Sequence, residues 1–316
     1  MASQSGSRLV IYAALIGNFL IAVTKFVASW ITGSSAMLSE GVHSLVDTGN
    51  ELLLLHGLRR SEQAPDRTHP FGYGRELYFW SFIVALLVFA LGAGVAFYEG
   101  VTHILDPEPA DNVTVNYAVL AISAVFEGVS WWIGLKEFNR RRGRLGFFEA
   151  ARQSKDPSVY TVLFEDSAAL LGLAIAFLGI LFAQLLDMPQ LDGVASIGIG
   201  CVLGATAVFL ARESKGLLMG EPALPQVERA LTAIVETDAA VERVNGILTV
   251  HLGPEQIVAG LSVEFEDRLD ATEIEACVER LEARLRREIP AITAFFVKPQ
   301  TARGWARRAM ALEDGR

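Results

Sequence analysis

The 316-residue chain has few cysteines and no excess of basic residues. Its two cysteines, Cys201 and Cys277, lie in different parts of the chain and give no disulfide framework, so we expect both to serve packing. Lysine and arginine number 27 against 36 acidic residues, and the formal net charge is −9. This charge balance excludes a broad basic surface for nucleic acid, and we expect no nucleic-acid partner.

The chain is rich instead in long apolar blocks, with 52% hydrophobic residues and a mean hydropathy of +0.36. Six blocks approach the roughly 20 residues that a helix needs to span a bilayer. They cover residues 9–30, 35–58, 77–98, 115–135, 160–186 and 194–211. We therefore expect a membrane protein whose residues 1–215 form an all-α, six-helix transmembrane domain in contact with the lipid bilayer.

The sequence after Glu221 changes to a charged, soluble pattern. Residues 257–265 alternate apolar side chains as a half-buried strand does, and residues 271–288 have the apolar spacing of an amphipathic helix. The full prediction for 221–300 is helix 224–235, strands 247–252 and 257–265, helix 271–288 and strand 292–298. It corresponds to a small α+β domain, an antiparallel sheet with two helices on one face, followed by a flexible tail over residues 301–316.

Basic residues are concentrated in two of the connecting segments, 59–75 and 139–155, whereas 32–34, 100–114 and 187–193 contain neither lysine nor arginine. The positive-inside rule places the two basic segments and both termini in the cytoplasm. The first apolar block is too long for a cleaved signal peptide and no arginine-rich presequence precedes it. We expect an integral protein of the bacterial plasma membrane.

His43 and Asp47 are four residues apart inside the second apolar block, so they lie on one face of its helix. An ionised aspartate near the middle of a bilayer costs roughly 2.5–3.5 kcal/mol on insertion scales, which argues for a function. An imidazole nitrogen and a carboxylate oxygen one turn apart make half of a tetrahedral zinc-type site. This pair indicates a binding site for a divalent metal ion.

Other carboxylates lie in the apolar blocks, namely Glu40, Glu127, Glu165 and Asp166. Glu40 is either a ligand or a hydrated residue at its helix end, and Glu127 is a ligand, a buried hydrogen-bonding group or a proton carrier. Glu165 and Asp166 are adjacent, so they point about 100° apart and cannot both face one centre without rotation. The alternative is that one of these two carboxylates contacts a residue of a neighbouring helix in place of the metal ion.

Three segments, SSAMLSEGVHSLVDTGNELLLLHGL, THPFGYGRELYFWSF and DPSVYTVLFEDSAALLGLAIAF, resemble the cation diffusion facilitator family, the solute carrier 30 group. The resemblance is strongest to the branch that contains the mitochondrial zinc transporter. It implies six membrane helices, a cytoplasmic ferredoxin-like domain, a homodimer, and efflux of a divalent metal ion in exchange for protons. It implies no enzyme activity and no cofactor besides the transported cation, Zn²⁺.

The resemblance also assigns metal ligands, two on helix two and two on helix five. His43 and Asp47 match the first pair, and Asp166 matches the second position of the other pair. Position 162, where the remaining ligand is expected, holds Val162, which cannot bind metal. The alternatives for the fourth ligand are water, Glu165, Glu127 and Glu40.

A second metal site of the family lies between helices two and three, where Asp66 and His69 match but the third position is Tyr73. The alternative is that this loop only caps the next helix. The soluble domain has one histidine, His251, which we expect to be structural, so we predict dimerisation without a multi-metal site.

Two other functions compete with a metal/proton antiporter. A membrane metalloenzyme would need a general base beside an open metal position, and the sequence has no HExxH-type or nucleophile motif. A non-transporting metal sensor or scaffold would bind metal without flux. The sequence does not decide between zinc and manganese, iron, cobalt or cadmium. The single histidine of the main site favours zinc, whereas the extra carboxylates favour harder ions.

Overall fold

The computed structural model describes residues 2–32, 35–107, 113–143 and 145–313; the side chains of residues 2–5, 29, 32, 35–40, 42, 43, 113 and 308–313 lie outside the description. The chain divides into two compact units. The helical unit comprises Met1–Arg60 and Glu76–Lys215, and the C-terminal unit comprises Ser61–Arg75 and Gly216–Arg316. The sequence does not predict that the loop before residue 76 belongs with the C-terminal residues.

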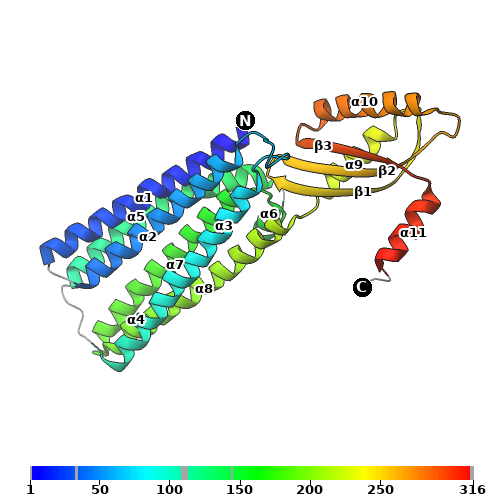
Figure 1. Cartoon of the computed structure of the whole chain (residues 1–316). Helices are drawn as coiled ribbons and strands as arrows, with labels where there is room; N and C mark the ends of the chain where they lie inside the picture. Colours follow the sequence, from blue (N-terminus) through cyan, green and yellow to red (C-terminus); the bar gives the residue numbers. More distant parts are fainter. Residues whose placement is uncertain (1, 33–34, 108–112, 144, 314–316) are drawn as a thin grey trace. The chain divides into compact units, whose positions relative to one another are not determined.

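The helical unit consists of long helices that run alongside one another (Figure 1). They are α1 (Ala2–Thr32), α2 (Ser35–Ser61), α3 (Arg75–Leu87), η1 (Val88–Ala93), α4 (Gly94–Leu105), α5 (Val113–Arg142), the short α6 (Phe147–Gln153), α7 (Pro157–Leu185) and α8 (Gln190–Met219). The π-helical segment η1 joins α3 directly to α4, so residues 75–105 form one helix with a local change of winding.

Five helical segments of the described chain are long and apolar enough to cross a membrane. They are Gly6–Ala28, Arg75–Leu105, Thr114–Arg142, Pro157–Leu185 and Gln190–Met219. This confirms five of the six predicted blocks as long apolar helices. The sixth block forms α2, a helix of 27 residues that is more polar because it carries Asp47, Asn50 and Glu51.

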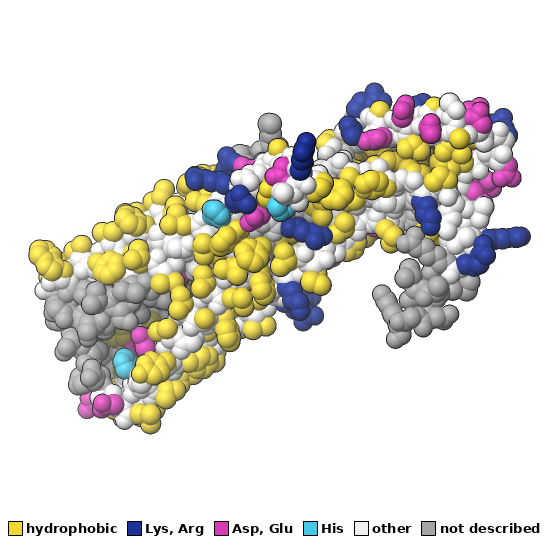
Figure 2. Space-filling model, in the orientation of Figure 1, with side chains coloured by type: hydrophobic (Ala, Val, Ile, Leu, Met, Phe, Trp, Pro, Cys, Tyr) yellow, Lys and Arg dark blue, Asp and Glu magenta, His cyan; other side chains and the backbone are white. Residues whose placement is uncertain are grey.

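The surface of the helical unit is largely hydrophobic on the face that Figure 2 shows. Large apolar side chains such as Trp30, Tyr98 and Leu105 are exposed, as expected for helices that contact lipid. The basic residues gather on this face at the end where α2 ends and α3 begins (Figure 2). The last turn of α2 contains Arg59 and Arg60, and the last turn of α5 contains three further arginines.

An ionic network ties three helices together at this basic end. Asp156, the N-cap of α7, accepts hydrogen bonds from Ser7 of α1 (2.6 Å) and from Arg141 of α5 (2.7 Å). Arg141 also donates to Ser7 (3.0 Å) and to Glu137 on its own helix (2.7 Å). The network fixes α1, α5 and α7 relative to one another where they begin or end.

Backbone contact between two helices occurs where α4 meets α8. A Cβ atom built on Gly100 would lie 2.8 Å from the carbonyl oxygen of Gly193, and one built on Gly193 would lie 2.7 Å from the carbonyl oxygen of Gly100. Only glycine at both positions permits this approach, which small residues commonly provide between membrane helices.

The C-terminal unit has the predicted order of helix, strand, strand, helix and strand. Its elements are α9 (Pro225–Val235), β1 (Val241–Gly253), β2 (Gln256–Phe265), α10 (Ala271–Glu288), β3 (Ile292–Pro299) and α11 (Ala302–Glu313). Asp270 begins α10 with a capping box, in which its side chain accepts from the Glu273 amide and Glu273 accepts from the Asp270 amide.

The sheet has the strand order β1-β2-β3. Strands β1 and β2 form an antiparallel hairpin whose two-residue turn joins Gly253 to Gln256. Strands β2 and β3 run parallel, with Ile257 beside Ile292. The prediction of an antiparallel sheet is therefore wrong for β3, because α10 carries the chain back along the sheet so that β3 starts beside the start of β2.

The hydrophobic core of the C-terminal unit lies between this sheet and the two helices α9 and α10. All five alternating residues predicted for β2 are buried, namely Ile257, Ala259, Leu261, Val263 and Phe265. Leu231 and Val235 of α9 and Leu281 of α10 join the same core. Cys277 also lies in this core, as predicted, whereas Cys201 is exposed, and both cysteines are free.

Within the predicted tail, residues 302–313 form the helix α11 (Ala302–Glu313). The Ala302 amide donates to the carboxylate of Glu264 on β2 (3.2 Å). The indole of Trp305 occupies the space over Gly246 of β1 that a Cβ would fill. Aromatic packing on a glycine and a hydrogen bond to the sheet thus hold the first turn of this helix.

Candidate metal-binding site in the helical unit

Carboxylates from three helices come close to one another inside the helical unit. Asp47 lies on α2, Glu127 on α5, and Glu165 and Asp166 on α7. Asp166 interacts electrostatically with the other three, and Glu127 interacts with Asp47. These four carboxylates therefore interact electrostatically in a part of the chain surrounded by apolar helices.

Asp166 is almost completely buried, with 2% of its surface exposed. The hydroxyl of Ser130 on α5 donates a hydrogen bond of 2.7 Å to its Oδ2. One residue further along each helix, the Trp131 indole donates to the Ser167 hydroxyl (2.8 Å). These two bonds fix the rotation of α7 against α5 and thereby the direction of the Asp166 carboxylate.

Glu165 is held by a different helix. Asn50 of α2 donates its amide Nδ2 to Glu165 Oε1 (3.3 Å), and Glu165 is 9% exposed. The adjacent residues Glu165 and Asp166 thus each have an interhelical partner, one on α2 and one on α5. This is the outcome expected for neighbouring helical residues that point about 100° apart.

Position 162 serves packing only. Val162 is fully buried in a core cluster with Val10 of α1, Leu54 of α2 and Val84 of α3. The apolar side chain at this position packs α7 against these helices. The structure therefore offers no oxygen or nitrogen ligand at the position where the family resemblance implies one.

The structure adds two charged residues that sequence reasoning missed. Glu51 of α2 is fully buried and interacts with Glu165, Asp166, Asp47 and Glu127. Its signal in the sequence is the spacing of four from Asp47, the same spacing that singles out His43. Lys25 of α1 is 8% exposed and donates to the Ser44 hydroxyl (2.9 Å). It is the only charged residue in the first apolar block.

Lys25 places a positive charge close to the acidic group, since it interacts electrostatically with Glu127. A buried ammonium ion partly offsets the repulsion among the carboxylates and reduces their demand for a bound cation. Four helices, α1, α2, α5 and α7, thus contribute ionisable side chains to this region.

The side chains of His43 and Glu40 lie outside the described residues, although α2 includes both positions. Among the described residues, no group of three or more His, Cys, Asp or Glu side chains lies close enough to hold a metal ion. A ligand set that includes His43 thus stays a prediction, and so does the place of Glu40 in it.

The Asp66 and His69 loop forms a compact hydrogen-bonded turn. Asp66 Oδ1 accepts from the Thr68 hydroxyl (2.7 Å) and from the backbone amides of Thr68 and His69, while Oδ2 accepts from Tyr73 (2.7 Å). The hydrogen bonds from Thr68 and Tyr73 hold the pKa of Asp66 well below its usual range. The His69 ring stacks on Tyr73, with centroids 4.1 Å apart. These contacts support the structural alternative for the loop.

His251 lies in β1 beside an irregularity of the strand pairing. It is buried, and its Nδ1 is 3.1 Å from the carbonyl oxygen of Gly253, to which it donates. The bond stabilises the end of the β1–β2 hairpin. This supports the predicted structural role of His251.

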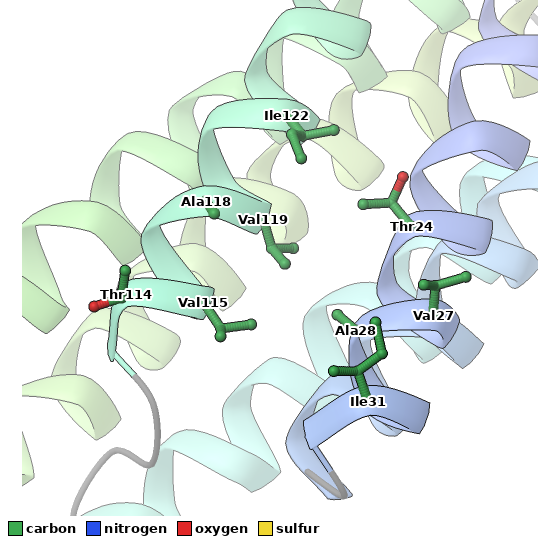
Figure 3. A pocket seen from close by; sticks show the side chains of 9 residues that line it. All are labelled: Thr24, Val27, Ala28, Ile31, Thr114, Val115, Ala118, Val119 and Ile122. Atoms are coloured by element: carbon green, nitrogen blue, oxygen red, sulfur yellow. The ribbon is translucent and has the colours of Figure 1, made fainter.

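A separate cavity of about 360 Å³ lies between α1 and α5. Figure 3 shows its lining side chains, among them Val27 and Ile31 of α1 and Val119 and Ile122 of α5. Apart from the hydroxyls of Thr24 and Thr114, the lining is apolar. Since it contains no carboxylate, imidazole or thiolate, the cavity is not the candidate site.

Buried carboxylates inside a group of long apolar helices are typical of membrane proteins that bind or conduct cations. Residues 11–219 match the family model described as the cation efflux transmembrane domain, and the chain belongs to this family. Members of the family are membrane transporters, and the predicted resemblance is confirmed.

Several curated proteins are similar to this chain. The human "Proton-coupled zinc antiporter SLC30A9, mitochondrial" is 34% identical over 84% of the chain, and the alignment covers 47% of that protein. "Metal tolerance protein C4" of Arabidopsis thaliana is 29% identical over 83% of the chain and 58% of its own length. "Cation-efflux pump FieF" of Escherichia fergusonii is 28% identical over 91% of the chain and 92% of its own length. The chain spans about half the length of the human relative.

Proposed function

We propose that the chain is a proton-coupled efflux transporter of divalent cations, with zinc as the first candidate ion. The observation that carries the proposal is the meeting of Asp47, Glu127 and Asp166, from three different helices, inside the helical unit. The names of the human antiporter and of the bacterial cation-efflux pump support the same activity.

The transport site would contain His43 and Asp47 from α2 and Asp166 from α7, with water or Glu165 as the fourth ligand. Ser130 supports this role, because an outer hydrogen bond orients a ligating carboxylate and fixes the lone pairs that it offers to the metal. Glu127 and Glu40 remain further candidates. The hydrogen bonds of Asp66 argue against including the 66–69 loop.

Proton coupling follows from the ligand types. Metal binding requires ionised carboxylates and a neutral imidazole, so metal ions and protons compete for the same atoms. An unperturbed imidazole titrates near pH 6.5, where small pH differences across a membrane change its charge. A site that opens alternately to the two sides would therefore bind metal on one side and release it to protons on the other.

The remaining features of the proposal concern the assembly. We infer six membrane-spanning helices, with α2 as the sixth, in the plasma membrane of a bacterium and with both termini on the cytoplasmic side. The C-terminal unit would be a cytoplasmic ferredoxin-like domain that holds two chains together as a homodimer. The basic ends of α2 and α5 support the orientation.

Transport by reconstituted protein tests the proposal. Vesicles that contain a zinc-sensitive dye or a pH-sensitive dye report zinc entry and the opposing movement of protons. We expect both signals for the wild type, and a zinc flux no greater than that of protein-free vesicles for Asp47→Ala and Asp166→Ala. Full flux in both variants would contradict the site, and zinc binding without flux would favour a sensor or scaffold.

The choice of ion is tested by calorimetric competition among zinc, manganese, iron, cobalt and cadmium. An imidazole ligand favours zinc, whereas carboxylate oxygens favour harder ions. Loss of the preference for zinc in His43→Ala, with manganese binding retained, is the expected result. An unchanged order of affinities would place His43 outside the ligand set.

A further inference from the structure

Among the described side chains of the helical unit, Glu51 is the most deeply buried charged group, with 0% of its surface exposed. Neither of its carboxylate oxygens has a hydrogen-bond partner among the described residues. A carboxylate that is removed from water without a partner is strongly destabilising. A bound cation compensates such a group directly, and neither the fold nor the proposed set of ligands gives Glu51 another role.

Two neighbours of Glu51, namely Glu165 and Asn50, also have a buried oxygen atom without a hydrogen-bond partner among the described residues. Glu165 of α7 is the residue whose charge acts most strongly on Glu51. It uses Oε1 to accept from Asn50, whereas its Oε2 and the Asn50 carbonyl Oδ1 are buried without a hydrogen-bond partner in the described part of the chain. Glu51 and Glu165 thus provide three buried carboxylate oxygen atoms that are available to a ligand.

This group lies beside the proposed transport site and is distinct from it. Glu51 follows Asp47 by one helical turn, about 6 Å along the axis of α2 and toward the end that carries Arg59 and Arg60. On α7, Glu165 is bound to α2 and Asp166 is bound to α5. The two adjacent carboxylates of α7 are therefore divided between two centres, and water, in place of Glu165, completes the ligand set of His43, Asp47 and Asp166.

We propose that Glu51 and Glu165 form a second divalent-cation site, with Asn50 orienting Glu165, one helical turn from the site of His43, Asp47 and Asp166. The inference rests on the proposed function. The two carboxylates balance the double charge of the ion. Because all of these ligands are oxygens, the site binds zinc more weakly than a centre with an imidazole. Weak binding suits a site through which ions pass on the way to a tighter one.

Calorimetric titration of the full chain in detergent with Zn²⁺ alone tests this site. The wild type is expected to bind a tight and a weaker zinc ion in the helical unit. Glu51→Gln, which keeps the side-chain shape, removes the weaker ion or lowers its affinity by about tenfold or more, and Asp47→Asn removes the tight ion. Glu149→Gln, on an exposed residue of α6, is the matched control and leaves both unchanged.

Zinc flux separates this inference from the proposed function. Glu51→Gln is expected to slow zinc entry at low zinc concentration and to approach the wild-type rate at saturating zinc, whereas Glu51→Asp, which keeps the charge, recovers part of the loss. Two zinc ions bound by Glu51→Gln as in the wild type would overturn the second site and leave the transporter intact. Absence of flux in the wild type, with the Glu51-dependent ion still bound, would overturn transport and retain the site.

Retention of helical circular dichroism and of a single size-exclusion peak identifies folded variants. If Glu51→Gln fails to fold, Asn50→Ala removes the hydrogen bond that orients Glu165 without changing the charge, and it is expected to weaken binding of the same zinc ion. A folded Asn50→Ala variant that binds both ions with wild-type affinity would contradict the site.

Discussion

The acidic residues of the C-terminal unit and those in the interior of the helical unit have different surroundings. In the C-terminal unit, carboxylates lie at the surface and pair with arginines, as in Arg243–Glu264 (2.6 Å) and Arg280–Asp238 (3.1 Å). In the helical unit, Glu51, Glu165 and Asp166 are buried. Glu165 and Asp166 accept hydrogen bonds from the neutral donors Asn50 and Ser130, respectively.

The cores of the two units also differ in whether they contain buried carboxylates. The C-terminal unit is built around one cluster of apolar side chains and Cys277, so burial of apolar surface stabilises it and its charges keep it soluble. In the helical unit the apolar clusters coexist with the buried carboxylates. Buried charges weaken the fold of the helical unit, and the proposed cation binding would compensate them, so we assign stability to the core of one region and propose function for the interior of the other.

The largest effect is expected from truncation of the C-terminal core. Leu281→Ala removes a fully buried side chain between α10 and the sheet and should lower the free energy of unfolding of this unit by about 2–5 kcal/mol. Leu248→Ala, on a residue of β1 that is 58% exposed, should change it by no more than about 0.5 kcal/mol. Denaturant unfolding of the full chain measures both, and equal effects would contradict the proposed core.

Burial raises the pKa of the Cys277 thiol to about 11, which provides an independent signal for the same experiment. The folded unit should react slowly with a thiol reagent near pH 8, because thiolate is scarce and the sulfur is enclosed. In a Cys201→Ser background, Leu281→Ala should accelerate labelling of Cys277. Rapid labelling of the protein that retains Leu281 would place Cys277 outside the core.

A second prediction sharpens the role of neutral hydrogen bonds in the helical unit. Ser130→Ala leaves the Asp166 carboxylate without its donor on α5 and should lower zinc affinity by about 10- to 100-fold. Ser81→Ala, at another fully buried serine on α3, should leave zinc affinity unchanged. Calorimetric titration with zinc distinguishes them. Equal losses would show that the effect of Ser130 comes from helix packing and not from the ligand.

The smallest effect is expected at the charged surface of the C-terminal unit. Burial opposes ionisation of Asp238, but hydrogen bonds from Arg280 and the Ala240 amide, together with the charge of Arg280, outweigh it and lower the pKa of Asp238. A lowered pKa stabilises the folded state above the unfolded value of about 3.9, and this stabilisation is lost as the pH falls through the folded value.

Asp238→Asn should therefore lower the melting temperature at pH 7 by only about 1–4 °C, as expected for a largely exposed pair. The difference between wild type and variant should decrease as the pH falls below about 3.9 and through the folded pKa of Asp238. Thermal unfolding followed over this pH range measures it. A difference that grows as the pH falls would contradict the assigned ion pair.

The sequence was sufficient where one segment determines its own structure. The alternation in β2 and the apolar face of α10 were predicted because each periodicity lies within a single element. The parallel pairing of β3 with β2 was not predicted, because it depends on the path of α10 across the sheet. The docking of Trp305 on Gly246 was likewise missed because it joins residues far apart in the chain.

The candidate site shows the same limit. Asp47, Glu165 and Asp166 stand out in the sequence, because ionisable residues within apolar helices are rare. The division of Glu165 and Asp166 between Asn50 and Ser130 depends on how α7 is rotated against α2 and α5, which no single helix specifies. Glu51 had a signal in its spacing from Asp47, but only the fold shows that it is completely buried.

Zinc uptake by vesicles under an imposed pH gradient tests most directly whether the buried carboxylates carry the ion. Asp166→Asn keeps the shape and most of the hydrogen bonding of the side chain, and Asp106→Asn, on an exposed residue after α4, is its control. We predict that Asp166→Asn abolishes gradient-driven uptake and that Asp106→Asn matches the wild type. Wild-type uptake by Asp166→Asn would contradict the assignment of transport to the carboxylates between α2, α5 and α7.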